Sequence, residues 1–130
     1  MDDSSPILVS ACLLGVPCRY DGTGQVDERI VALAKTRHLI PVCPEQLGGL
    51  PTPRPSAERS GTRVLTRDDR DVTAPFQRGA EETLRLARLF SCRIAILKAN
   101  SPSCGSGQIY DGCFCGRLIP GDGLTAALLK

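Results

Sequence analysis

Cysteine is the residue type in this chain with the greatest chemical potential, because 7 of the 130 residues are cysteines. Disulfides are rare in reducing compartments, and an odd number of cysteines leaves at least one thiol unpaired. Three of them, Cys12, Cys43 and Cys104, lie far apart along the chain. Thiolates are soft ligands that favour zinc or an iron–sulfur cluster. Their spacing lacks the close C-x-x-C pairs of a zinc ribbon. Two interpretations therefore stay open: the three cysteines bind a metal centre, or they are small buried apolar residues.

Short apolar runs precede these three cysteines and predict the elements that position them. We expect buried strands at residues 7–11, 39–42 and 94–98, with Pro41 counting against a central place for the second. Cys12 and Cys43 directly follow two of these strands, and Cys104 lies a turn beyond the third. In parallel sheets, ligands bind outside the carboxyl ends of the strands. The predicted strands therefore bring the three thiols to one edge of a sheet.

Helical patterns lie between the predicted strands. Apolar residues at helical spacing predict one helix over about 26–34 and another over 73–91, the second capped by Thr73. The second helix carries a predicted core face, made of Phe76, Ala80, Leu84, Ala87 and Phe90. Strands alternating with helices predict an α/β fold, a single-domain three-layer Rossmann-like arrangement with a mainly parallel sheet over residues 1–130.

The rest of the chain offers weaker signals. Prolines and glycines crowd residues 44–61, which we expect to form a long restricted loop of the kind that often carries function. An edge strand is predicted at 63–66 and a short helix at 123–129. His38 is predicted at a helix end without a catalytic role, and Cys92 in the core.

Composition excludes several classes of function. The net charge of +2, with two tyrosines, three phenylalanines and no tryptophan, disfavours binding to a nucleic-acid polymer. No apolar run approaches the length of about 20 residues that spans a membrane. The acidic start, Met1-Asp2-Asp3-Ser4-Ser5, differs from a signal peptide. We expect a cytoplasmic protein with no membrane partner, and the sequence indicates no oligomeric state.

Several motifs, in order along nearly the whole chain, resemble the short, single-domain thiouracil desulfidase family, formerly a domain of unknown function. The matching segments are V-S-A-C-L-L-G at 9–15, C-R-Y-D-G at 18–22, P-V-C-P-E-Q-L-G-G-L-P-T-P-R at 41–54, I-L-K at 96–98, S-P-S-C-G at 101–105, I-Y-D-G at 109–112 and G-D-G-L-T-A-A-L-L at 121–129. The resemblance implies a non-redox enzyme that converts a thiolated nucleobase such as 2-thiouracil to uracil plus sulfide.

The resemblance also implies a cofactor and site residues. A [4Fe-4S] cluster would be held by Cys12, Cys43 and Cys104, and its fourth iron, without a protein ligand, would take the sulfur of a small thiolated heterocycle. Glu45 matches the acid/base carboxylate of the family, and Ser101 matches a serine thought to assist at the substrate. An open iron is a Lewis acid for soft sulfur, while a carboxylate can take a proton from water and return it. The reaction would be hydrolytic and need no electron donor.

Each of the proposed site residues outside the three cysteines has a second interpretation. Glu45 can be a solvated loop carboxylate, and Ser101 a turn residue ahead of Pro102. Lys98 either offsets the negative charge of a cluster or extends to solvent. Cys18, six residues after Cys12, is the main rival ligand, against a role in packing beside the site.

Residues near these motifs carry similar alternatives. Arg19 and Tyr20 are expected to hold their loop or to contact the substrate. Arg54 either lines the entrance or is an ordinary surface arginine. Cys113 and Cys115 depart from the family pattern, in which small hydroxyl residues are usual here. On a strand, two residues this far apart would point to the same face. They could act there as redox partners or as sulfur acceptors, but we expect them to pack beside Phe114.

Two other functions remain open at the level of the sequence. A sulfur carrier would hold a persulfide on Cys113, Cys115 or Cys18 without a cluster. A non-catalytic metal-binding module would use the same ligands without turnover.

Overall fold

The centre of the molecule is a three-stranded parallel sheet. The structure, a computed structural model, describes residues 5–130, so residues 1–4 of the acidic start lie outside the described part. Strands β1 (Ile7–Ser10), β2 (Leu39–Val42) and β5 (Ile94–Ile96) lie in the order β2-β1-β5. Ile7 of β1 pairs with Leu39 on one side and with Ile94 on the other. The predicted parallel sheet is confirmed. Strand β1 lies at its centre and β2 at an edge, where Pro41, which has no N–H to donate, is tolerated.

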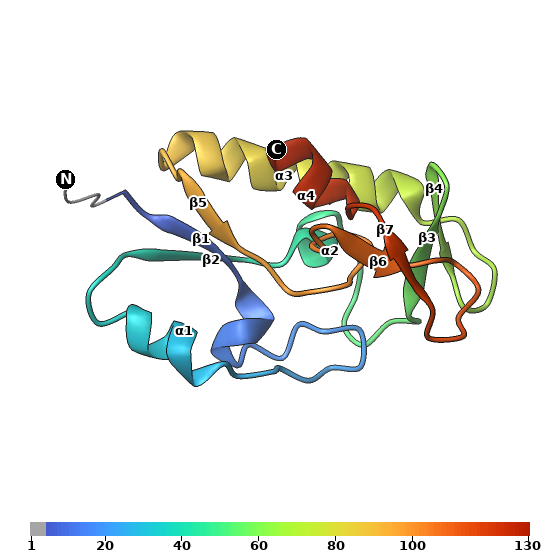
Figure 1. The fold of residues 1–130 in the computed structure, drawn as a ribbon, viewed down its shortest axis with the longest axis horizontal. Helices are drawn as coiled ribbons and strands as arrows, with labels where there is room; N and C mark the ends of the chain where they lie inside the picture. Colours follow the sequence, from blue (N-terminus) through green and yellow to red (C-terminus); the bar gives the residue numbers. More distant parts are fainter. Residues whose placement is uncertain (1–4) are drawn as a thin grey trace.

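Helices cover both faces of this sheet (Figure 1). Helices α3 (Thr73–Leu89) and α4 (Leu124–Leu129) lie on one face, and α1 (Glu28–Leu33) lies on the other. Successive side chains of β1 point to opposite faces. Leu8 packs in a buried cluster with Ala87 of α3, whereas Val9 packs with Ile30 of α1. The predicted three-layer α/β arrangement is therefore confirmed.

Several predicted boundaries differ from the structure. The first strand ends at Ser10, because a 3-10 helix, η1 (Ala11–Leu14), begins there. Thr73 does not cap α3: its hydroxyl accepts the Val64 N–H at 2.8 Å, and Val72 occupies the capping position without a side-chain bond. Phe90 lies beyond the end of α3 and is exposed, so it is not part of the core face.

The segment predicted as a long loop contains two elements. Helix α2 (Pro44–Leu47) follows β2 directly, and β3 (Ala57–Ser60) pairs antiparallel with β4 (Arg63–Thr66). The predicted edge strand at 63–66 thus belongs to a separate hairpin. A second hairpin, β6 (Gln108–Tyr110) with β7 (Leu118–Pro120), was not expected from the sequence. Within residues 5–130, no helix is both long and apolar enough to cross a membrane.

Helix α2 lies directly against α3 through two glycines. A Cβ added at Gly79 would stand 1.8 Å from the Pro44 carbonyl oxygen, and one at Gly48 would stand 1.9 Å from the Pro75 carbonyl oxygen. No side chain other than hydrogen fits at either position. This close approach fixes α2, and with it Cys43 and Glu45, relative to the longest helix of the molecule.

Candidate functional site

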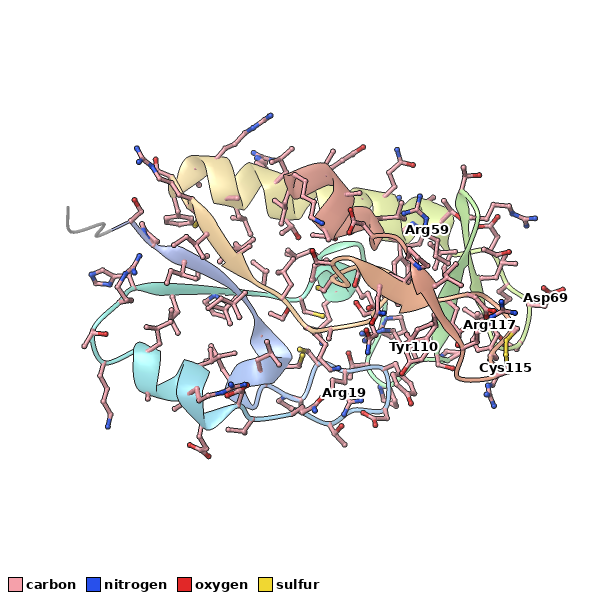
Figure 2. All side chains as sticks on the ribbon, viewed as in Figure 1. Arg19, Arg59, Asp69, Tyr110, Cys115 and Arg117 are labelled. Atoms are coloured by element: carbon pink, nitrogen blue, oxygen red, sulfur yellow. A yellow bond between two sulfur atoms is a disulfide. The ribbon has the colours of Figure 1, made fainter. Side chains whose placement is uncertain are left out.

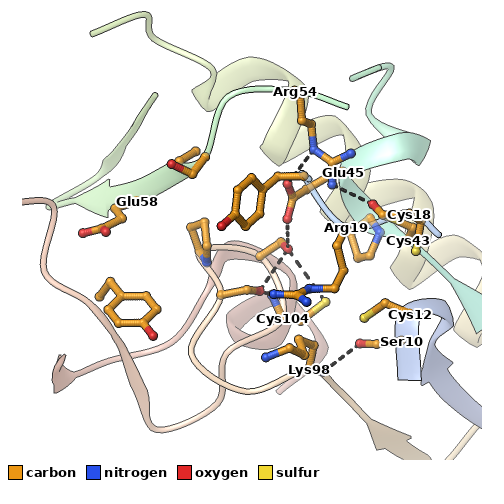
Figure 3. A pocket seen from close by; sticks show the side chains of 18 of the residues that line it. Ser10, Cys12, Cys18, Arg19, Cys43, Glu45, Arg54, Glu58, Lys98 and Cys104 are labelled. Carbon is orange, nitrogen blue, oxygen red and sulfur yellow. Dashed lines mark hydrogen bonds and ion pairs between the residues drawn. The ribbon is translucent and has the colours of Figure 1, made fainter. Parts of the chain in front are cut away.

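A cavity of about 380 Å³ opens at the carboxyl ends of the parallel strands. Its wall contains all three thiols that the strand prediction brought together, and Cys18 beside them (Figure 3). Cys12, Cys18 and Cys104 are buried and Cys43 is partly buried. All four are free thiols. The predicted convergence of Cys12, Cys43 and Cys104 on one edge is confirmed in its geometry.

Each of these three cysteines is held by the element that follows its strand. Cys12 lies in η1, where its carbonyl oxygen accepts N–H groups of Gly15 and Gln25. Cys43 directly follows β2 and caps the start of α2. Cys104 ends a turn in which its N–H donates to the Ser101 hydroxyl at 2.7 Å.

The start of helix α4 fixes the turn that carries Cys104. The N–H groups of Thr125 and Ala126 donate to the Ser103 carbonyl, and a Cβ on Gly123 would stand 2.5 Å from that carbonyl. Gly123 is therefore required for this contact. The cysteine is tied to a helix as well as to β5.

Burial dominates the ionisation of these thiols. Burial first, with smaller contributions that include the neighbouring Cys43, raises the pKa of the Cys104 thiol to about 11 and that of Cys18 to about 12. The pKa of Cys12 is also raised, first by burial, while the positive charges of Lys98 and Arg19 oppose the shift. Metal binding requires thiolates, and a bound cation supplies the charge that stabilises them.

The sulfur positions fit a cluster better than a single ion. Around one tetrahedral zinc, ligand sulfurs stand about 3.8 Å apart, given Zn–S bonds of about 2.3 Å. Within residues 5–130, the only trio of His, Cys, Asp or Glu ligand atoms lying within 4.8 Å of one another is Asp111, Cys113 and Cys115. Cys12, Cys43 and Cys104 are spread more widely, as thiolates that bind different irons of one cluster must be.

Glu45 lies in the same cavity and is held at both carboxylate oxygens. Arg54 Nε lies 3.0 Å from Oε1, and the Ser103 hydroxyl donates to Oε2 at 3.0 Å (Figure 3). The side chain of Glu45 is only 17% exposed. The interpretation of Glu45 as a solvated loop carboxylate is therefore wrong.

Arg54 lines the cavity and is not an ordinary surface arginine. Its side chain is 5% exposed and donates to Glu45, to the Thr52 hydroxyl and to the carbonyl oxygens of Pro51 and Cys18. A buried guanidinium with this many partners is a fixed part of the site. The available signal was its place at the end of the P-T-P-R segment, two residues after Thr52.

Ser103 was missed by the sequence analysis, and Ser101 has a double role. Ser103 is 1% exposed, and its hydroxyl lies between Glu45, Ser101 Oγ at 3.3 Å and Cys104 Sγ at 3.7 Å. Ser101 lines the cavity and also accepts the Cys104 N–H, so the two interpretations of Ser101 are compatible. The signal for Ser103 was its position directly before a predicted ligand.

The remaining candidates occupy different parts of the cavity and the sheet. Arg19 and Tyr20 line the cavity, and Arg19 also contacts the Thr23 hydroxyl at 3.5 Å, so it both holds its loop and faces the site. Lys98 lines the cavity near Cys12, in agreement with a role in offsetting negative charge. His38 lies before β2, at the opposite end of the sheet from the cavity, and its carbonyl accepts the Ile7 N–H.

Cys113 and Cys115 correct two expectations. They lie in the loop between β6 and β7 rather than on a strand, they are exposed, and they form a disulfide with each other. The predicted packing role is wrong, and the bonded pair agrees with the alternative of redox partners. Their sulfurs share a covalent bond, so the trio with Asp111 offers no thiolates to a metal. Cys92 packs against the cluster of Leu8, Val42 and Ala87, which confirms its predicted place in the core.

Comparison with known proteins gives consistent results. Residues 7–130 match the family described as 2-thiouracil desulfurase. An uncharacterized protein of Bacillus subtilis (strain 168), YbbK, is 45% identical over 134 residues, covering 95% of this chain and 89% of that protein. A solved structure of the [4Fe-4S]-dependent thiouracil desulfidase TudS is 52% identical and superposes with a TM-score of 0.91, covering 96% of this chain and 84% of the other.

Proposed function

The chain belongs to the 2-thiouracil desulfurase family, and we propose that it is a [4Fe-4S]-dependent desulfidase that converts 2-thiouracil to uracil and sulfide by hydrolysis. The observation that carries this proposal is that one cavity joins three free thiols from the ends of β1, β2 and β5 to the Glu45–Arg54 pair. The 52% identity to a thiouracil desulfidase supports the same substrate class. The substrate is a small thiolated heterocycle, and residues 1–130 work as one domain.

Cys12, Cys43 and Cys104 would hold the cluster. Each is attached to a strand end or to the turn after β5, and their sulfurs do not all lie within 4.8 Å of one another, which favours a cluster over one ion. We assign Cys18 a place beside the cluster as a free thiol; its backbone carbonyl accepts the Cys43 thiol at 3.7 Å and Arg54 Nη2 at 3.0 Å, which ties its loop to the site. When bound with one iron free of protein ligands, the cluster supplies a Lewis acid with high affinity for the substrate sulfur.

Glu45 is the proposed acid/base group. A water that adds to the carbon bearing the sulfur must lose a proton, and a carboxylate within hydrogen-bond reach can accept it and return it to the ring or to the leaving sulfur. Arg54, itself part of the cavity wall, fixes Oε1 of Glu45, and Ser103 fixes Oε2. Glu45 is thereby oriented before the substrate arrives.

The two serines link the carboxylate to the thiol end of the site. Ser103 donates to Glu45 and lies 3.3 Å from Ser101, whose hydroxyl lines the cavity. We assign to Ser101 a hydrogen bond to the substrate. Lys98 and Arg19 contribute positive charge where thiolates and leaving sulfide carry negative charge.

The two other functions considered from the sequence are less well supported. A sulfur carrier without a cluster disagrees with the [4Fe-4S] dependence of the 52% identical neighbour. A non-catalytic metal module leaves the buried Arg54 and its pairing with Glu45 without a purpose.

The proposal is tested with protein purified without oxygen. We expect a brown protein that contains iron and converts 2-thiouracil to uracil, with sulfide equal to uracil over many turnovers. The matched control is Glu45→Gln, which should keep the iron and lose turnover. A colourless protein that stays inactive after cluster reconstitution would contradict the proposal.

A further inference from the structure

The far end of the cavity from Cys12 is formed by a loop that carries the only disulfide among the described residues. Residues 111–117 connect β6 to β7, and Cys113 and Cys115 are bonded and exposed (Figure 2). Phe114 between them and Gly116 after them line the cavity that also contains the four free thiols. The two cysteines do not line the cavity themselves, but they are direct chain neighbours of two residues of the wall of the cavity in which sulfide would be released.

Several contacts hold this loop against the cavity. Glu58, which is 9% exposed, accepts the N–H groups of Gly112 at 3.0 Å and of Phe114 at 3.2 Å through Oε1. Arg67 donates to the Phe114 carbonyl at 3.3 Å, and its guanidinium lies 5.6 Å from the centre of the phenyl ring. These bonds fix the peptide between the two cysteines. The disulfide is thus presented in a defined position and is not on a free surface turn.

Charged groups beside the disulfide suit an anionic nucleophile. An Asp111 carboxylate oxygen lies within 4.8 Å of both sulfurs and accepts the Cys113 N–H at 2.9 Å. Arg117 lies 3.8 Å from the same carboxylate and offsets its negative charge, and the Arg67 guanidinium lies over the Phe114 ring. The two arginines attract a small anion, and the carboxylate can carry a proton.

We propose that the Cys113–Cys115 disulfide captures the sulfide product as a persulfide, an inference that rests on the desulfidase function proposed above. Disulfides are opened by sulfur nucleophiles that attack one of the two sulfurs. Here the hydrosulfide sulfur attacks one cysteine, a new S–S bond forms, and the Cys113–Cys115 bond breaks with its electron pair on the other cysteine. Asp111 carries the hydrosulfide proton to that departing thiolate.

The step is balanced without another reactant. The sulfide sulfur loses two electrons and the disulfide gains two, so that one persulfide and one thiol replace one hydrosulfide and one disulfide. Each chain can therefore capture one sulfide, after which sulfide leaves free. Persulfides are reversible and can pass their outer sulfur to another thiol. The loop is then a sulfur acceptor at the exit of a desulfidase.

The test follows the first turnover of the holoenzyme, purified without oxygen and without reductant. The enzyme is mixed with a few equivalents of 2-thiouracil, uracil and free sulfide are measured, and the protein is alkylated and cleaved before aspartates. This yields residues 111–121, which contain Cys113 and Cys115 as their only cysteines. We expect free sulfide to fall short of uracil by one equivalent per chain, and this peptide to gain one sulfur atom.

A second arm uses sodium sulfide alone, so that the inference does not depend on the enzyme's activity. The expected product is the same peptide with one added sulfur. Cys115→Ser, which cannot form the disulfide, should give free sulfide equal to uracil and an unmodified peptide in both arms. Absence of uracil would contradict the desulfidase function, and the sodium sulfide arm would then decide the capture step by itself.

Three results would overturn the capture step. The first is sulfide equal to uracil from the first turnover with the loop disulfide intact. The second is added sulfur on peptides other than 111–121. The third is uptake of alkylating reagent by both loop cysteines in the untreated enzyme, because the disulfide would then be absent from the start.

Discussion

The two ends of the cavity both carry sulfur, but they are built in different ways. At one end, Cys12, Cys43 and Cys104 follow strands of the central sheet and stay free. At the other end, Cys113 and Cys115 lie exposed in a hairpin loop and are bonded to each other. The first arrangement keeps thiols buried and separate, which suits metal ligation. The second exposes a reactive S–S bond, which suits sulfur exchange.

The two ends also differ in what holds them. The thiol end depends on parts of the main core: the sheet, the start of α4 and the glycine contact between α2 and α3. The loop end depends mainly on the carboxylate of Glu58 and on Arg67. Changes at the thiol end should therefore remove cofactor and turnover, while changes at the loop end should leave the cofactor in place.

The largest effect is expected for Cys43→Ala. Loss of one thiolate from the ligand set should abolish stable iron binding and turnover. Cys92→Ala is the matched control, because Cys92 is a partly buried free thiol outside the cavity and should keep its iron. Iron content after purification without oxygen measures both variants. If Cys43→Ala kept the iron content of the unmodified protein, the distinction between ligand cysteines and core cysteines would be wrong.

The second largest effect is expected for Glu45→Gln. The amide keeps the volume and can still contact Arg54 and Ser103, but it cannot accept a proton from water. Loss of a positioned general acid or base lowers rates by about 10²–10⁴-fold. We expect a fall in kcat of this order with unchanged iron and visible absorption. Turnover within threefold of the unmodified protein would remove Glu45 from the acid/base role.

Arg54→Ala should weaken both stability and turnover. Breaking a buried ion pair by removing one partner costs about 3–5 kcal/mol, and we expect the lower end because Glu45 is 17% exposed. Urea unfolding measures the change. In the Glu45→Gln background the same substitution should cost less, since the two residues act as a pair. Strictly additive effects would show that Arg54 does not act through Glu45.

Glu58→Ala tests the loop end. It leaves the N–H groups of Gly112 and Phe114 without their acceptor, which should lower the free energy of unfolding by about 1–3 kcal/mol. Glu58→Gln, which keeps an acceptor oxygen, should lose less. Iron content should stay at the value of the unmodified protein in both variants. Loss of iron in Glu58→Ala would mean that the two ends are not independent.

Asp71→Asn gives the smallest expected effect and a reference away from both ends. Hydrogen bonds from Thr73, together with Arg63, lower the pKa of the Asp71 carboxyl to about 2. A carboxyl with a lowered pKa stabilises the folded state above its unfolded pKa of about 3.9, and this contribution is lost as pH falls toward 2. The difference in thermal midpoint between the unmodified protein and Asp71→Asn should therefore shrink from pH 5 to pH 2. A constant difference would contradict this assignment.

The thiol end could be predicted from the sequence because its signals are local. Short, mainly apolar runs end at Cys12 and Cys43, and parallel topology brings such ends together. Arg54 and Ser103 could not be assigned in the same way. Their burial depends on how residues 44–61 fold back over the turn before Cys104, and nothing in the spacing of that segment encodes this contact.

The loop end was beyond prediction for a different reason. Strands β6 and β7 have three residues each, which is too short for a recognisable alternation. The interpretation that Cys113 and Cys115 share one face of a strand fails because β6 ends at Tyr110, before both of them. The resemblance to the family offered no help here, since these two cysteines depart from its pattern.

The most direct test of the central claim, that three cysteines hold the cluster and leave one iron for the substrate, is the iron content of Cys18→Ser. Cys18 is the one other buried thiol in the cavity wall. We expect about four iron atoms per chain, as in the unmodified protein, whereas Cys12→Ser and Cys104→Ser should lose them. Loss of iron in Cys18→Ser would make Cys18 a fourth ligand and would contradict the open iron.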